Sequence, residues 1–200
     1  IQKMYDELVK EINQITKAEF EIIFINDGSK DRTFERMLAI AAGDSRVKYI
    51  SFSRNFGKEA GTIAGLEYAT GEAVILMDGD LQHPPAMLPQ MIEAYEQGYD
   101  VVSARRTRTG EKRHRTFLAK HFYKLANKMM DIELMDGVSE FRLFSRKVVN
   151  AIISMQEYNR FSKGIFAWIG FNEKVIEYEN QVRTVGETKY SLKFSLNYAI

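Results

Sequence analysis

Two aspartates separated by one glycine, Asp78 and Asp80, have the residue types and spacing best suited to chemistry in this sequence. They follow an uninterrupted apolar run, residues 73–77, which is typical of a strand buried on both faces of a parallel sheet. Ligands of open α/β sheets bind beyond the carboxyl ends of the strands. Two carboxylates there offer oxygen ligands to Mg²⁺ or Mn²⁺ carrying a substrate diphosphate. The plain alternative is an Asp-rich turn without function.

Two other loops place polar side chains after predicted strands. Asp27 follows the strand predicted at residues 20–25, and Gly28 permits a tight turn there. Arg54 follows the strand predicted at residues 47–52. All three loops are therefore expected at the same edge of one sheet.

The hydrophobic pattern alternates between strand and helix over most of the chain. Helices are predicted at residues 1–15, 34–41, 58–69 and 84–95, and strands at 20–25, 47–52, 73–77, 100–104 and 174–179. This order predicts an α/β fold, Rossmann-like, with a mostly parallel, doubly wound sheet and helices on both faces.

Composition narrows the class of protein. The 200 residues are 45% hydrophobic, enough for one domain, and the net charge of +1 does not favour nucleic acid as a partner. Cysteine is absent, which excludes disulfides and thiolate metal sites. No apolar run reaches the ~18 residues of a membrane span, and no signal peptide is visible.

Residues 105–128 form a basic segment with a single acid, Glu111. Within it Leu118, Phe122 and Leu125 share one helical face, beside lysines that repeat every four residues. An apolar face next to a basic face suits a helix lying in a membrane interface. A solvated helix packed on the core has the same spacing, so both interpretations stay open.

The aspartate pair belongs to a longer motif, D-x-D-L-Q-x-P-P, formed by Asp78, Asp80, Leu81, Gln82, Pro84 and Pro85. In this the sequence resembles the family 2 glycosyltransferases of GT-A fold, specifically the polyprenyl-phosphate subgroup that includes dolichyl-phosphate mannose synthase and bactoprenol glucosyltransferases. The resemblance implies that Asp78 and Asp80 bind Mg²⁺ or Mn²⁺ and that Asp78 and Gln82 contact the nucleotide sugar. It also implies a role for Asp80 in catalysis.

Four further motifs occur in family order. Residues 26–33 match N-D-G-S-x-D-x-T, which implies that Asp27 contacts the nucleotide, and Arg54 begins an R-N-x-G motif near the same ligand. Residues 140–146 resemble D-F-R-L-x-x-R, but Glu140 replaces the aspartate that is the candidate base of the family, and Asp136 is a nearby substitute.

The fourth motif, R-x-x-G-x-S-K-Y, corresponds to residues 183–190 with threonine for serine. A loop with Arg and Lys beside a hydroxyl is suited to closing over phosphates. The residues expected to bind the acceptor phosphate are Arg105, Arg142, Arg146, Arg183, Thr188 and Lys189.

The resemblance implies an inverting glycosyltransferase that moves a sugar from a nucleotide sugar, which we expect to be UDP-glucose, to polyprenyl (undecaprenyl) phosphate. The expected location is the cytoplasmic face of a membrane. The sequence leaves open whether the protein forms a homo-oligomer. We expect residues 1–200 to be a single GT-A catalytic domain that lacks its first strand and its C-terminal membrane helices.

Two alternatives remain. One is a family 2 transferase acting on a polysaccharide or protein-linked sugar. The other is a catalytically inactive module that binds nucleotide sugars.

Overall fold

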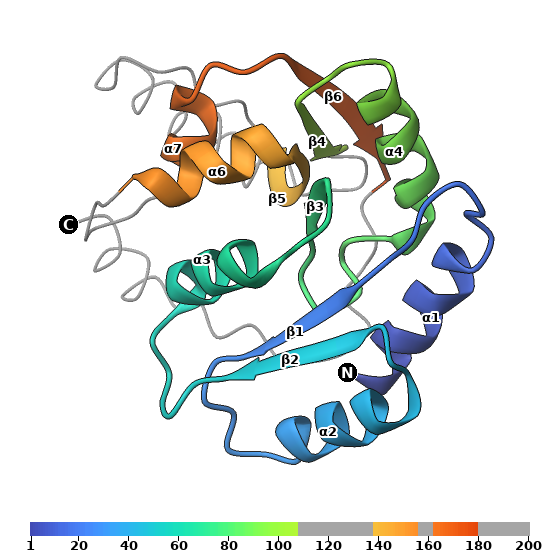
Figure 1. Cartoon of the computed structure of the whole chain (residues 1–200), viewed down its shortest axis with the longest axis vertical. Helices are drawn as coiled ribbons and strands as arrows, with labels where there is room; N and C mark the ends of the chain where they lie inside the picture. The colour runs from blue at the N-terminus through green and yellow to red at the C-terminus, as the bar shows by residue number, and fades with distance from the viewer. Residues whose placement is uncertain (108–137, 156–161, 180–200) are drawn as a thin grey trace, which may run out of the picture.

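The computed structural model describes residues 1–107, 138–155 and 162–179 (Figure 1). In the first half strands and helices alternate, as predicted. The elements are α1 (Gln2–Ile12), β1 (Ile22–Asn26), α2 (Thr33–Gly43), β2 (Val47–Ser51), α3 (Lys58–Tyr68) and β3 (Ala73–Leu76).

The second half begins with a short 3-10 turn, η1, in which Pro85 lies in the first turn, where its missing N–H costs nothing. The elements are η1 (Pro85–Met87), α4 (Leu88–Glu96), β4 (Val101–Arg106), β5 (Val138–Ser145), α6 (Arg146–Ser154), α7 (Ser162–Trp168) and β6 (Glu173–Tyr178). The predicted basic helix lies mostly outside the described residues.

The strands form two hydrogen-bonded sets. β1 and β2 pair in parallel, and a four-stranded sheet has the order β3-β5-β4-β6. β4 and β6 are parallel, but β5 runs antiparallel to both β3 and β4. The α/β class is confirmed, and the expectation of parallel pairing fails at β3 because a strand that the sequence did not predict lies beside it.

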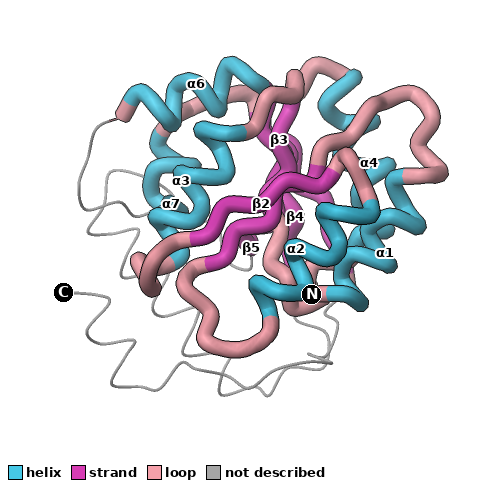
Figure 2. Tube along the Cα trace, turned by 60° about the horizontal axis from the view of Figure 1, so that its bottom comes forward, coloured by secondary structure: helices cyan, strands magenta, loops and turns pink. Residues whose placement is uncertain are grey.

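Helices cover both faces of the strands (Figure 2). One buried cluster joins α1, α2 and α4 to the strands through Ile12, Ile40 and Met91. A second cluster lies under α3, α6 and α7 and includes Leu66 and Phe166. Burial on both faces explains the continuous hydrophobic run of β4, whereas the apolar side chains of β3 are only partly buried against the two clusters.

Glu21, just before β1, connects three segments through its carboxylate. It accepts the Thr70 N–H at 2.6 Å and the Gly71 N–H at 3.2 Å, and it pairs with the Lys48 ammonium at 2.6 Å. Burial raises the pKa of Glu21, but the bonds from Lys48 and Thr70 outweigh it and lower the pKa to about 2. The ionised form therefore stabilises the fold.

We expect Glu21→Gln to lower the free energy of unfolding by ~2 kcal/mol at pH 7, because the amide loses the ion pair and one acceptor oxygen. The pKa of Glu21 is lower in the folded protein than in the unfolded chain. The stabilisation is therefore complete at pH values above the unfolded pKa of Glu, and it is lost as the pH falls through about 2. Urea denaturation of both proteins across this range is the measurement. Glu19→Gln, at an exposed position, is the control. If the free energy of unfolding of Glu21→Gln differed from that of the parent protein by the same amount at every pH, the role of Glu21 would be contradicted.

Candidate active site

The pairing of β3 with β5 brings Asp78 and Glu140 to the same end of these two strands. The antiparallel register runs from Ala73↔Ser145 to Leu76↔Arg142. Asp78 lies two residues beyond the last paired residue of β3, and Glu140 lies two residues before Arg142 in β5. Both carboxylates contact the same lysine, which shows that they lie close together.

A lysine lies between these two carboxylates. The Nζ of Lys58, the first residue of α3, is 2.8 Å from Asp78 Oδ1 and 2.6 Å from Glu140 Oε2. Burial lowers the pKa of Lys58, but the two carboxylates raise it by more, so the ammonium stays charged. Sequence reasoning used Lys58 only as the start of a helix and missed this contact. The available signal was a lysine at a helix N-terminus, where the helix dipole disfavours a cation.

His83 fixes the backbone of the aspartate turn. Its Nδ1 accepts the Asp78 N–H at 2.9 Å, so the ring proton is assigned to Nε2, which lies 3.8 Å from Asp78 Oδ2. The ring is buried and stacks on Phe141 with 5.1 Å between centroids. Burial lowers the pKa of His83, so the imidazole is neutral at pH 7.

Asp80 lies in a strained turn beside a cavity. Its Oδ1 accepts the Gln82 N–H at 3.0 Å, and Leu81 between them has a φ of 65°, a conformation that bulky residues rarely adopt. A cavity of about 410 Å³ opens beside Asp80, Gly79 and Leu81 and reaches Arg36 and the start of α1. This volume is in the range of small-molecule sites.

Asp27 organises the loop that leads to α3. Its two carboxylate oxygens accept the N–H groups of Phe56 at 2.7 Å and Gly57 at 3.0 Å. Gly28 beside it has a φ of +64°, and a Cβ there would lie 2.4 Å from the carbonyl carbon of Arg54. The guanidinium of Arg54 lies 4.3 Å from the Phe56 ring centre. The two predicted nucleotide-binding loops therefore touch, and their contact with a nucleotide stays a prediction.

Each of the three predicted phosphate-binding arginines of the described residues has a partner within the protein. Arg105 on β4 pairs with Glu177 of β6. Arg142 on β5 is buried, 3.5 Å from Glu173, and burial lowers the pKa of this guanidinium. Both arginines are thus engaged with carboxylates of the protein.

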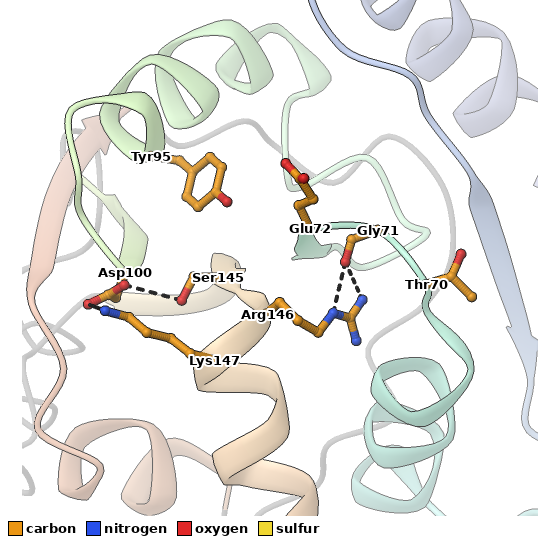
Figure 3. A pocket seen from close by; sticks show the side chains of 8 residues that line it. All are labelled: Thr70, Gly71, Glu72, Tyr95, Asp100, Ser145, Arg146 and Lys147. Atoms are coloured by element: carbon orange, nitrogen blue, oxygen red, sulfur yellow. Dashed lines mark hydrogen bonds and ion pairs between the residues drawn. The ribbon is translucent and has the colours of Figure 1, made fainter.

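Arg146 lies at the opposite end of β3 from Asp78. Its guanidinium donates to the Gly71 carbonyl just before that strand. It lines a second cavity of about 560 Å³, where Lys147 pairs with Asp100 at 2.7 Å (Figure 3). The structure does not bring Arg146 together with the aspartate pair, and its contact with an acceptor phosphate stays a prediction.

The remaining predicted site residues lie outside the described residues. They are Asp136, Arg183, Thr188 and Lys189.

The side chains of the aspartate turn fit a divalent ion shared with a substrate. Within the described ranges, no three His, Cys, Asp or Glu side chains are grouped to hold a metal by themselves. Mg²⁺ is commonly bound by one or two carboxylates together with substrate phosphates and water. Asp78 and Asp80 supply two hard oxygen donors for such a site, with the remaining positions left for a diphosphate.

Solved structures similar in fold confirm the α/β class. Glucosyl-3-phosphoglycerate synthase of Mycobacterium tuberculosis, solved with Mn²⁺, UDP-glucose and phosphoglyceric acid, aligns with a TM-score of 0.55. The alignment covers 96% of this chain and 69% of that chain at 18% identity. At this identity the likeness establishes the fold alone, and that fold is of the GT-A type predicted.

The sequence comparisons establish the family. Residues 2–153 match glycosyl transferase family 2, and the chain belongs to that family. It is 50% identical over 200 residues to a Bacillus subtilis (strain 168) protein with the provisional name glycosyltransferase CsbB. It is also 43% identical over 184 residues, 92% of this chain, to the bactoprenol glucosyl transferase of Shigella phage SfX. The chain spans about 60% of the length of each of these relatives.

Among the described helices, none has the length and apolar character that crossing a membrane requires.

We expect Gly28→Ala to lower the free energy of unfolding by at least ~2 kcal/mol, because the new methyl overlaps the backbone at Arg54 and the φ is unfavourable. Thermal unfolding measures this. Gly43→Ala, where a Cβ meets no atom within 4 Å, is the matched control and should be neutral or stabilising. Equal stability of the two variants would contradict the close crossing of the two loops.

Proposed function

We propose that the protein transfers glucose from UDP-glucose to a polyprenyl phosphate with inversion at the anomeric carbon. The observation that carries the proposal is the acidic cluster at the carboxyl end of β3, where Asp78 lies across from Glu140 and next to the turn that contains Asp80. The acceptor class and the sugar are supported by the bactoprenol glucosyl transferase relative.

In this proposal Asp78 and Asp80 hold Mg²⁺ or Mn²⁺, which when bound stabilises charge on the departing nucleoside diphosphate. Asp27, Arg54 and Gln82 form the wall that binds the donor. Asp27 keeps the loop after Arg54 in place through two backbone hydrogen bonds, and the Arg54 guanidinium lies over the Phe56 ring of that loop.

The acceptor needs little help from a base. A phosphate monoester has its second pKa near 6, so its attacking oxygen is already ionised at pH 7. That oxygen forms a bond to the anomeric carbon while the bond from this carbon to the diphosphate oxygen breaks. Glu140 is engaged by Lys58 and is therefore assigned to orientation and charge rather than to proton abstraction, with Asp136 the other candidate.

Positive side chains would bind the acceptor phosphate. Arg105, Arg183, Thr188 and Lys189 are our candidates, and Arg142 and Arg146 join them only by leaving their partners within the protein. The basic segment 105–128 would lie on an anionic membrane surface, on the cytoplasmic side. We treat the chain as one catalytic domain, and the proposal leaves its oligomeric state open.

Transfer of label from a panel of nucleotide sugars into undecaprenyl phosphate, with and without Mg²⁺ or Mn²⁺, tests the proposal. The expected result is metal-dependent labelling of the lipid from UDP-glucose. Labelling of oligosaccharide acceptors instead would favour a polysaccharide transferase. Nucleotide-sugar binding without transfer to either acceptor would favour an inactive binding module.

We expect Asp80→Asn to reduce kcat/KM by ~100-fold or more and Glu140→Gln by ~10-fold, because the first removes a metal ligand and the second keeps a polar group beside an acceptor that is already ionised. Steady-state transfer assays on both variants measure this. Glu93→Gln, an exposed acid on α4, should match the parent protein. Loss of turnover in Glu140→Gln with little change in Asp80→Asn would reverse the assigned roles.

A further inference from the structure

Lys58 brings a positive charge into the acidic cluster of the site. Its ammonium contacts Asp78 and Glu140 at the two short distances given above, and both partners are themselves half-buried or more. Asp80 lies in the same turn, two residues after Asp78. The Lys58 ammonium therefore contacts two carboxylates directly, and a third belongs to the same turn.

The position of Lys58 in α3 is not explained by helix stability. The first turn of a helix favours anions, and a lysine there is mildly unfavourable. The N-cap, Gly57, has a φ of 94° and its N–H is held by Asp27, so the helix start is anchored without the lysine. The two ion pairs therefore account for the charge at this position better than the helix does.

We propose that Lys58 is a positioning residue that acts as an internal counter-ion, holding the carboxylates of Asp78 and Glu140 and weakening divalent-ion binding until the donor diphosphate arrives. The inference rests on the proposed function in one respect, that Asp78 and Asp80 are the metal ligands.

Charge balance gives the direction of the effect. Replacing Lys58 by a neutral residue makes the cluster of Asp78, Asp80 and Glu140 more negative by one charge. The ammonium also occupies Asp78 Oδ1, an oxygen that a metal ion needs. A divalent ion meeting the donor-free protein must therefore displace Lys58 or accept fewer oxygen ligands. A diphosphate supplies further oxygens and negative charge, which offsets this penalty.

Mn²⁺ titration of the purified intact protein without nucleotide, followed by electron paramagnetic resonance, tests the proposal without requiring turnover. We expect Lys58→Met and Lys58→Gln to bind Mn²⁺ ~10-fold more tightly than the parent protein, because a competing cation about 3 Å from the ligands is gone. Lys58→Arg, which keeps the charge, should stay within about 2-fold of the parent.

Lys147→Met is the matched control, because Lys147 is also in the first turn of a helix and also pairs with a carboxylate, Asp100, at 2.7 Å. Its Mn²⁺ affinity should equal that of the parent. A damaged fold would weaken metal binding, so damage does not explain tighter binding. Lys58→Gln provides the same test if Lys58→Met does not fold. Equal or weaker Mn²⁺ binding in the neutral variants, or none in any protein, would overturn the role of Lys58. Failure of glucose transfer in the parent would instead overturn the proposed function.

Discussion

The antiparallel pairing of β5 with β3 is the constraint on which the site depends. It brings Asp78, just beyond the end of β3, close to Glu140 of β5, over 60 residues away in sequence, and both carboxylates contact the Lys58 ammonium. A shift of one residue in this register would turn Glu140 to the other face of the sheet and bring Phe141 into its place. Burial of Phe141 and Leu143 on one face and Phe144 on the other opposes such a shift, so the core itself sets the geometry of the acidic cluster.

The loops around this cluster hold one another in place. Asp27 binds the backbone just before α3, and α3 then presents Lys58 to Asp78 and Glu140. His83 holds the backbone of Asp78 from the other side, while the chain between them takes a strained turn at Leu81. Strain that persists in a turn bearing two carboxylates is consistent with a site shaped for a ligand rather than for stability.

Sequence reasoning predicted α1, α2, α3 and α4, all the described strands except β5, and the carboxyl-end position of Asp27 and Asp78, because hydrophobic periodicity and turn residues are local signals. It did not predict α6 or α7. It did not predict β5, since antiparallel insertion of a strand between β3 and β4 depends on contacts far apart in sequence. Arg142 and Arg146 read as one motif, yet four residues along a strand span about 13 Å, so they reach different places. The partners of Lys58 could not be predicted for the same reason as β5, because both come from other segments, although a lysine at a helix N-terminus is itself an unusual feature.

The central claim is that Asp78 and Asp80 together hold the cation on the donor diphosphate. Anomalous scattering from Mn²⁺ in crystals grown with UDP tests it most directly. The account predicts a manganese peak within coordination distance of carboxylate oxygens of both aspartates, with the β-phosphate on the same ion. A peak elsewhere, or UDP bound away from the carboxyl end of β3, would contradict it.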